Sequence, residues 1–164
     1  MQNDSSPDNW CEWLEANSSR FLLFARQQTR TETDAEDVLQ DSLVESWRRA
    51  GNRRPKPALV FTTIRRRAID LGRSHERRLA RELVSESEKT WFEPDIETRD
   101  SNRVLESAVR TLPPDQAEVL VLKTWGELTF REIAETLGIP QNTAASRYRY
   151  ALEELRKCLK GALL

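Results

Sequence analysis

Apolar residues recur at helical spacing in the first quarter of the chain. Within residues 9–28, six of them can share one side of a helix: Trp10, Trp13, Leu14, Phe21, Phe24 and Ala25. A second helix is predicted over 33–50, because Thr33 can cap it and Glu36, three residues later, completes a capping box. Its apolar stripe consists of Val38, Leu39, Leu43 and Trp47. Gly51 ends this helix.

A third helix is predicted from Ala58 to Arg73. The segment before it, 51–57, contains a glycine and two prolines, which prevent one continuous helix. The buried side of the third helix is expected to contain Leu59, Val60, Phe61, Ile64, Ala68, Ile69 and Leu71. After residue 74 the chain becomes polar, and we expect a flexible linker over 81–100.

The remaining chain predicts a second group of helices. Residues 101–112 form a short amphipathic segment, and Pro113 and Pro114 fit the start of the next helix, where a missing N–H costs nothing. Helices over 129–138 and from 141 to about Lys160 complete the group. No alternating strand pattern appears. We therefore expect an all-α protein with two small helical domains, 1–80 and 101–164, joined by the linker.

The string FREIAETLGIPQNTAASRYRYAL, residues 130–152, has the layout of a helix-turn-helix. Gly138 can take the left-handed conformation at the end of the first helix, and Pro140 prevents that helix from continuing. The second helix starts with small and polar residues, which would let its backbone approach a DNA groove closely. Its predicted DNA-facing residues are Asn142, Thr143, Ala145, Ser146, Arg147, Arg149 and Tyr150. An ordinary helical corner with a solvated face is the alternative interpretation.

Charge is distributed unevenly along the 164 residues, although the formal net charge is only −1. Residues 1–47 carry three basic and ten acidic side chains, whereas residues 48–81 carry twelve basic and two acidic ones. Solvated surfaces usually mix both signs, so the basic block predicts a polyanion or an acidic partner. The three consecutive arginines of 65–67 point in three directions around a helix, so internal contacts are not expected to mask them all.

Catalytic and membrane functions find no support in the sequence. His75 is the only histidine, and it lies in a polar stretch where we expect it to be exposed. Cys11 and Cys158 are far apart and lack metal or redox spacing, so two reduced thiols are expected. No nucleophile–base set, metal-ligand spacing or Gly-rich phosphate loop appears. We expect a cytoplasmic, non-enzymatic protein with no cofactor, no metal site and no membrane insertion.

Three strings resemble a known family. LPPDQAEVLVL, followed by ELTFREIAETLGIPQNTAASRYRYALEELRK, resembles the fourth conserved region of bacterial extracytoplasmic-function (ECF) sigma factors. DAEDVLQDSLVESWRR resembles their second region, whose helix binds the RNA polymerase clamp. FTTIRRRAIDLGRSHERR is similar to the adjoining segment, which melts and holds the minus-ten promoter element. The strings follow one another in the family's order and cover most of the chain.

The resemblance implies a polymerase subunit that selects promoters and catalyses no reaction. It implies three partners: core RNA polymerase, promoter DNA and an anti-sigma factor. The domain over 1–80 would be region two and the domain over 101–164 region four. Core polymerase would bind Asp34, Asp37, Gln40 and Asp41. Minus-ten DNA would bind Arg53, Arg54, Lys56, Arg65, Arg66, Arg67, Arg73 and Arg77.

The helix that begins near residue 141 would read the minus-thirty-five element. On it, Arg147 is expected to contact a base and Arg149 a phosphate, because two residues two positions apart point in different directions. Two other interpretations stay open. One is a sigma-like decoy that sequesters an anti-sigma factor, and the other is a stand-alone helix-turn-helix regulator that works as a dimer.

Overall fold

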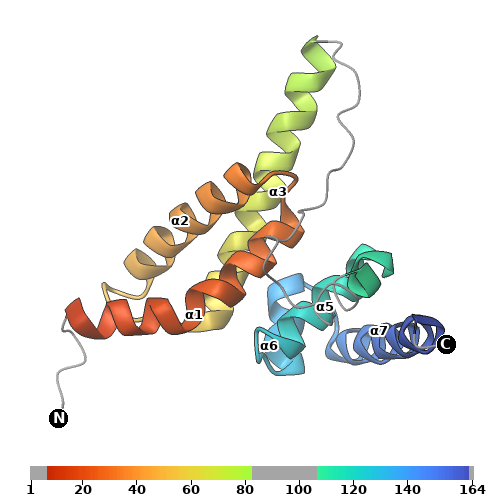
Figure 1. Cartoon of the computed structure of the whole chain (residues 1–164). Coiled ribbons are helices and arrows are strands. Elements are labelled where there is room, and N and C mark those ends of the chain that lie inside the picture. The colour runs from red at the N-terminus through yellow and green to blue at the C-terminus, as the bar shows by residue number, and fades with distance from the viewer. Residues whose placement is uncertain (1–6, 83–106, 163–164) are drawn as a thin grey trace. The chain divides into compact units, whose positions relative to one another are not determined.

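The computed structural model describes residues 7–82 and 107–162 (Figure 1). Every regular element in these two ranges is a helix, which confirms the predicted all-α class. The chain divides into two compact units, Met1–Phe92 and Glu93–Leu164. The predicted linker over 81–100 falls outside the described residues, except that its first two residues belong to a helix. No helix in the described ranges is both long and apolar enough to cross a bilayer.

Within residues 7–82 the first unit contains three helices, and each packs against the other two: α1 (Pro7–Gln28), α2 (Glu32–Arg49) and α3 (Pro57–Glu82). Aromatic side chains form the centre of their core. The Phe61 ring on α3 lies 5.0 Å from Phe21 and 5.4 Å from Phe24, both on α1 and both edge to face. All three side chains are fully buried. Such edge-to-face pairs add to the free energy of burial, so these rings fix α1 against α3.

Helix α2 packs on its neighbours through small side chains. Ala35, Ser42 and Ser46 are fully buried, and Val38 is 5 % exposed. Of the predicted stripe only Val38 is therefore deeply buried, whereas its three larger members are half-buried. The Ser46 hydroxyl lies 3.4 Å from the Thr63 hydroxyl on α3. Small residues on the buried side allow two helix backbones to come close together.

The start of α2 differs from the prediction. Thr31, not Thr33, is the N-cap, and its side chain accepts a hydrogen bond from the Asp34 N–H at 3.1 Å. The predicted capping box of Thr33 and Glu36 is wrong. Both threonines precede an acidic residue by three positions, so the local pattern fits either start. A tertiary contact favours the earlier one, because Arg26 of α1 pairs with Glu32 at 2.7 Å.

Helix α3 is longer than predicted and continues past Arg73 to Glu82. Gly72 lies inside it, where glycine costs about 1 kcal/mol relative to alanine but does not break a helix. No proline follows before residue 83 to stop the hydrogen-bond ladder. The change to a polar composition therefore marked the end of the buried face and not the end of the helix.

The second unit contains a helical turn over 107–111, followed by α5 (Pro114–Thr124), α6 (Phe130–Leu137) and α7 (Gln141–Ala162). Pro113 is the N-cap of α5 and Pro114 starts it, as predicted. The core of this unit consists of Ala108, Val109, Leu112, Ala117, Leu120, Ala151 and Leu155. It joins the turn, α5 and α7 into one packed group.

The turn after α5 requires a glycine. A Cβ at Gly126 would lie only 2.5 Å from the Leu122 carbonyl oxygen, so no other residue fits without movement of the backbone. The chain then reaches Thr129, which caps α6. The Thr129 hydroxyl accepts from the Glu132 N–H, and the Glu132 carboxylate accepts from the Thr129 N–H at 3.1 Å. This capping box fixes where the helix-turn-helix begins.

The capping assignment predicts the effect of two threonine substitutions. Thr31→Ala should lower the free energy of unfolding by about 1 kcal/mol, because the Asp34 N–H loses its acceptor. Thr33→Ala is the matched control and should change it by less than about 0.5 kcal/mol. Urea denaturation followed by circular dichroism measures both. A larger effect at Thr33 than at Thr31 would contradict the assignment.

Candidate nucleic-acid interface and acidic groove

The helix-turn-helix has the turn that the sequence predicts. Gly138 ends α6 in the left-handed conformation, with φ 66°, and its N–H donates to the Ala134 carbonyl. The Ile139 N–H donates to the same carbonyl at 3.0 Å. Pro140 then accepts from the Ala144 N–H at 3.1 Å in the first turn of α7. Ala134 and Ala144 are both buried, so two small side chains lie in the part of the unit where α6 packs on α7.

The outer face of α7 presents part of the predicted DNA-binding set to solvent. Asn142, Arg149 and Tyr150 are exposed, whereas Thr143, Ala145 and Ser146 are half-buried. Tyr150 is 47 % exposed, and the Arg149 guanidinium lies 5.2 Å from the centre of its ring. An exposed arginine stacked on an aromatic ring offers both charge and a flat apolar surface to a nucleic acid.

Arg147 lies on the flank of α7 and not on its outer face. Its side chain is 30 % exposed, and its Nε lies 3.5 Å from the Asp115 carboxylate at the start of α5. Arg147 was predicted to lie on the exposed side of this helix together with Arg149, but only Arg149 is exposed. The physical reason is the neighbouring helix, since Asp115 offers a carboxylate beside that flank. The Arg147 Nη donors are not used by this pair.

Most of the predicted minus-ten residues lie on α3. Arg66, Arg73 and Arg77 are exposed, and their spacing of seven and four residues places them on one face of the helix. Arg53 and Lys56 are exposed just before α3, and Arg54 is half-buried there. Arg65 and Arg67 are also half-buried. The structure thus gathers part of the predicted minus-ten set on one side of α3.

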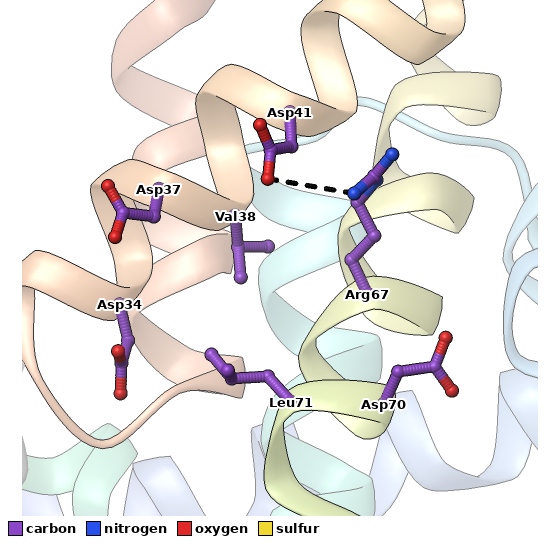
Figure 2. Close-up of a pocket in the computed structure, with 7 residues that line it drawn as sticks. All are labelled: Asp34, Asp37, Val38, Asp41, Arg67, Asp70 and Leu71. Carbon is purple, nitrogen blue, oxygen red and sulfur yellow. Dashed lines mark ion pairs between the residues drawn. The ribbon is translucent and has the colours of Figure 1, made fainter. Parts of the chain in front are cut away.

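A groove between α2 and α3 collects three of the four predicted polymerase-binding residues. Figure 2 shows its lining, which consists of Asp34, Asp37, Val38, Asp41, Arg67, Asp70 and Leu71. Its volume is about 350 Å³. Gln40 is exposed on the same helix but does not line the groove. The lining combines four carboxylates with two apolar side chains, which suits a cationic group with an aliphatic stem.

One ion pair and one histidine–carboxylate contact connect α2 to α3 along this groove. The Arg67 Nη1 lies 3.6 Å from the Asp41 carboxylate (Figure 2). His75 is half-buried and not fully exposed as expected, because its Nε2 lies 3.4 Å from the Asp34 carboxylate. Both contacts join α2 to α3. The acidic helix and the basic helix are therefore partly complementary to each other.

Glu45 is a residue that the sequence analysis missed. Its side chain is 18 % exposed and accepts a hydrogen bond from the Arg67 Nε at 2.8 Å. It also accepts one from the Arg66 Nη2, and the Arg49 Nε lies 3.5 Å away. Burial alone raises the pKa of Glu45, but the hydrogen bonds and the charges of Arg66 and Arg67 outweigh it and hold the pKa below the ordinary value of 4.5.

Metal and redox chemistry find no cluster of side chains in the described parts of the chain. No group of three or more His, Cys, Asp or Glu residues there could hold a metal ion. Cys11 and Cys158 are exposed free cysteines. The features that could bind a partner are thus the outer face of α7, the basic face of α3 and the acidic groove.

Comparisons with known proteins cover both units. The family model for sigma-70, region 4, matches residues 102–155. The ECF RNA polymerase sigma factor RpoE of Cereibacter sphaeroides is 31% identical over 137 residues, which cover 76% of this chain and 72% of the relative. The RNA polymerase sigma-E factor of Streptomyces avermitilis is 30% identical over 156 residues, which cover 92% and 84%.

Solved structures share the fold. One is the sigma factor RpoE from Bartonella quintana, crystallised with the anti-sigma factor NepR. It matches with a TM-score of 0.74 at 21% identity and covers 93% of this chain and 97% of that one. A second is CnrH in complex with the cytosolic domain of CnrY, with a TM-score of 0.60.

The half-buried carboxylate of Glu45 predicts a pH dependence of stability. Its pKa in the folded chain is below the unfolded value near 4.5, so its contribution is complete above that value and is lost as the pH falls through the folded value. We expect the stability difference between wild type and Glu45→Gln to shrink from about pH 6 to about pH 3. Urea denaturation at several pH values measures it. Exposed Glu15, replaced by Gln, is the charge-matched control, and parallel curves for wild type and Glu45→Gln would refute the expectation.

Proposed function

This chain belongs to the family of ECF RNA polymerase sigma factors, and on that premise we propose that it binds core RNA polymerase and directs initiation at specific promoters. The observation that carries the proposal is the identity of 31% with an ECF sigma factor over 137 residues, which reach across both units. Core polymerase and promoter DNA are the proposed partners. Because transcription takes place in the bacterial cytoplasm, we place the protein there.

The first unit is proposed to bind core polymerase through α2. Asp34, Asp37 and Asp41 line the acidic groove, and Gln40 lies exposed beside them. Val44 is 50 % exposed and lies three or four residues from both Gln40 and Asp41. An apolar side chain among carboxylates suits a basic helical partner. The partner can bury the apolar surface of the valine while its cations pair with the carboxylates.

The same unit is proposed to hold the melted minus-ten element on the basic side of α3. The proposed contacts are Arg53, Arg54, Lys56, Arg65, Arg66, Arg67, Arg73 and Arg77. Single-stranded DNA exposes its phosphates and bases, so a row of guanidinium groups binds it with a strong dependence on salt. The exposed row formed by Arg66, Arg73 and Arg77 supports this role.

The second unit is proposed to bind the minus-thirty-five element through α7. The proposed contacts are Asn142, Thr143, Ala145, Ser146, Arg147, Arg149 and Tyr150. The small residues at the start of α7 let the helix enter the major groove, and the longer side chains that follow reach its edges. The Arg147–Asp115 pair supports a base-reading role for Arg147, because a guanidinium held in place can present its Nη donors in one direction.

An anti-sigma factor is a further proposed partner. It would compete with core polymerase and promoter DNA for the same surfaces of this chain. The decoy interpretation requires only such protein contacts. The exposed arginines of α3 favour a complete sigma factor over a decoy, because a decoy has no use for a DNA-binding face. A stand-alone regulator, in turn, has no use for the acidic groove on α2.

Core polymerase binding tests the proposal directly. The purified full-length chain should bind core polymerase, and Asp37→Arg should weaken binding by about tenfold or more, because it places a cation against a basic partner. Asp37 is exposed and off the buried side of α2, so helicity should not change. Glu12→Arg on α1 makes the same change of charge at an exposed site and is the control. A wild-type chain that fails to bind core polymerase would overturn the proposed function.

Two arginines of α7 should have separable effects on DNA binding. Arg147→Ala should reduce the preference of the holoenzyme for its own minus-thirty-five sequence by about 1–3 kcal/mol. Arg149→Ala should weaken binding to all DNA sequences alike. It should also lower the slope of log affinity against log salt concentration by about one unit. Asp115→Asn should reproduce part of the Arg147 effect, because it frees that guanidinium. Affinities for matched and mismatched duplexes at two salt concentrations measure this.

Lys157→Ala is the control for α7, because Lys157 lies far along the helix and pairs with Glu154 at 3.0 Å. Unchanged discrimination between matched and mismatched duplexes in Arg147→Ala would contradict the prediction. Asn142, Thr143 and Ser146 would then be the candidate base contacts.

A further inference from the structure

A half-buried carboxylate, Glu45 of α2, lies on the basic side of the first unit. We propose that Glu45 is a positioning residue, which holds the guanidinium groups of Arg66 and Arg67 in the orientation that binds the phosphates of single-stranded DNA. The proposal rests on the proposed function, in which this unit holds the melted minus-ten strand. It adds an acidic residue to the proposed minus-ten surface.

The Glu45 carboxylate is less exposed than the guanidinium groups that contact it. Glu45 is 18 % exposed, whereas Arg66 is 46 % and Arg67 36 % exposed. The two carboxylate oxygens are divided between the arginines, since Oε1 accepts from Arg66 and Oε2 accepts from Arg67. Arg49, on the last turn of α2, lies at 3.5 Å from Oε1 and is 56 % exposed. Three guanidinium groups from two helices thus converge on one anion and keep their outer sides in solvent.

The number of donors leaves room for a second anion. Each guanidinium has five N–H donors. Toward Glu45, Arg67 uses its Nε and Arg66 uses one Nη, so each keeps further N–H groups for another acceptor. Three cations share Glu45, and Asp41 adds a second carboxylate at 3.6 Å from Arg67. The N–H donors of Arg66 and Arg67 that do not face Glu45 or Asp41 can bind phosphate oxygens.

Holding the arginines in place has a thermodynamic consequence. A long side chain that is free in solution loses rotamer entropy when it binds, and a side chain that is already fixed loses less. Arg66 and Arg67 are consecutive on α3 and would otherwise point in different directions around it. Glu45 draws both toward α2, which brings their guanidinium groups together. Adjacent phosphates on a flexible single strand would then meet donors that need no rearrangement.

A different role for Glu45 predicts the opposite sign. If the carboxylate only masked the two arginines, its removal would free positive charge, and single-stranded DNA would bind more tightly. If it positions them, its removal weakens binding although the surface becomes more basic. The sign of the change in affinity therefore separates positioning from masking.

The experiment uses holoenzyme assembled from the full-length chain and core polymerase. The probe is a fluorescent oligonucleotide of the non-template strand across the minus-ten element of a promoter at which the wild-type holoenzyme initiates. Glu45→Gln should weaken its binding by about three- to tenfold, in line with the ordering of two long side chains. Glu15→Gln, with the same charge change at an exposed site of α1, should leave it unchanged. Binding of a duplex with only the minus-thirty-five element should be equal in all variants.

A second variant keeps the test valid should Glu45→Gln fold poorly. Arg67→Lys keeps the net charge but cannot reproduce the guanidinium contacts of Glu45 and Asp41, so it should also weaken binding of the oligonucleotide. Tighter or unchanged binding in Glu45→Gln or in Arg67→Lys overturns the proposal. That outcome leaves the proposed function intact as long as the wild-type holoenzyme initiates, whereas a wild type that does not initiate refutes both.

Discussion

The close approach of α2 to α3 is the constraint on which the first unit depends. It is possible because the buried side of α2 consists of small residues, and Ser46 lies against Thr63 with 3.4 Å between the hydroxyls. A leucine at Ser46 would separate the helices by the width of its side chain. The contacts along the seam, Arg67 with Glu45 and with Asp41, reach only 2.8 to 3.6 Å, so they would be lost. Packing with small residues therefore makes the electrostatic arrangement possible.

The same seam explains how one small unit can present two surfaces of opposite charge. The acidic block of residues 1–47 and the basic block of 48–81 would each repel itself if it were isolated. On adjacent helices they compensate each other in part, through the contacts of Arg67 with Glu45 and Asp41, while the groove between the helices stays acidic.

Local rules predicted the features that a short stretch of chain decides. Gly138 has the expected left-handed conformation, and Pro114 starts α5, because each depends on the backbone of a few residues. The start of α2 could not be predicted in this way. Two threonines fit the same capping pattern, and the choice depends on Arg26, which belongs to another helix. The end of α3 was missed for a related reason, since a polar composition does not end a helix that lacks a breaker.

The candidate site shows the same division. A run of basic residues predicted a nucleic-acid surface on α3, but the sequence contains no local sign that Glu45 lies beneath it, 21 and 22 positions before its partners. Acidic residues on α2 were interpreted by their distance from the apolar stripe. That criterion identifies Asp37 but overlooks Glu45. The predicted stripe contained leucines and a tryptophan, whereas the buried side of α2 consists mainly of alanine and serine.

Both units use one device at the helices that are proposed to bind DNA. In the second unit Asp115 of α5 lies 3.5 Å from the Nε of Arg147, and in the first unit Glu45 of α2 lies 2.8 Å from the Nε of Arg67. In each case a carboxylate from a neighbouring helix holds the stem side of a guanidinium whose Nη groups extend further. These arginines are 30 % and 36 % exposed, less than Arg66 or Arg49.

A count of charges along the chain treats all arginines alike, and such a count overestimates the charge that is free for phosphates. A paired arginine offers less free charge but a better defined direction, because the carboxylate on the neighbouring helix restricts the rotamers of its side chain. Charge alone attracts any polyanion, whereas a directed guanidinium favours one arrangement of acceptors. Exposed arginines such as Arg73 and Arg149 suit attraction, and the paired ones suit selection.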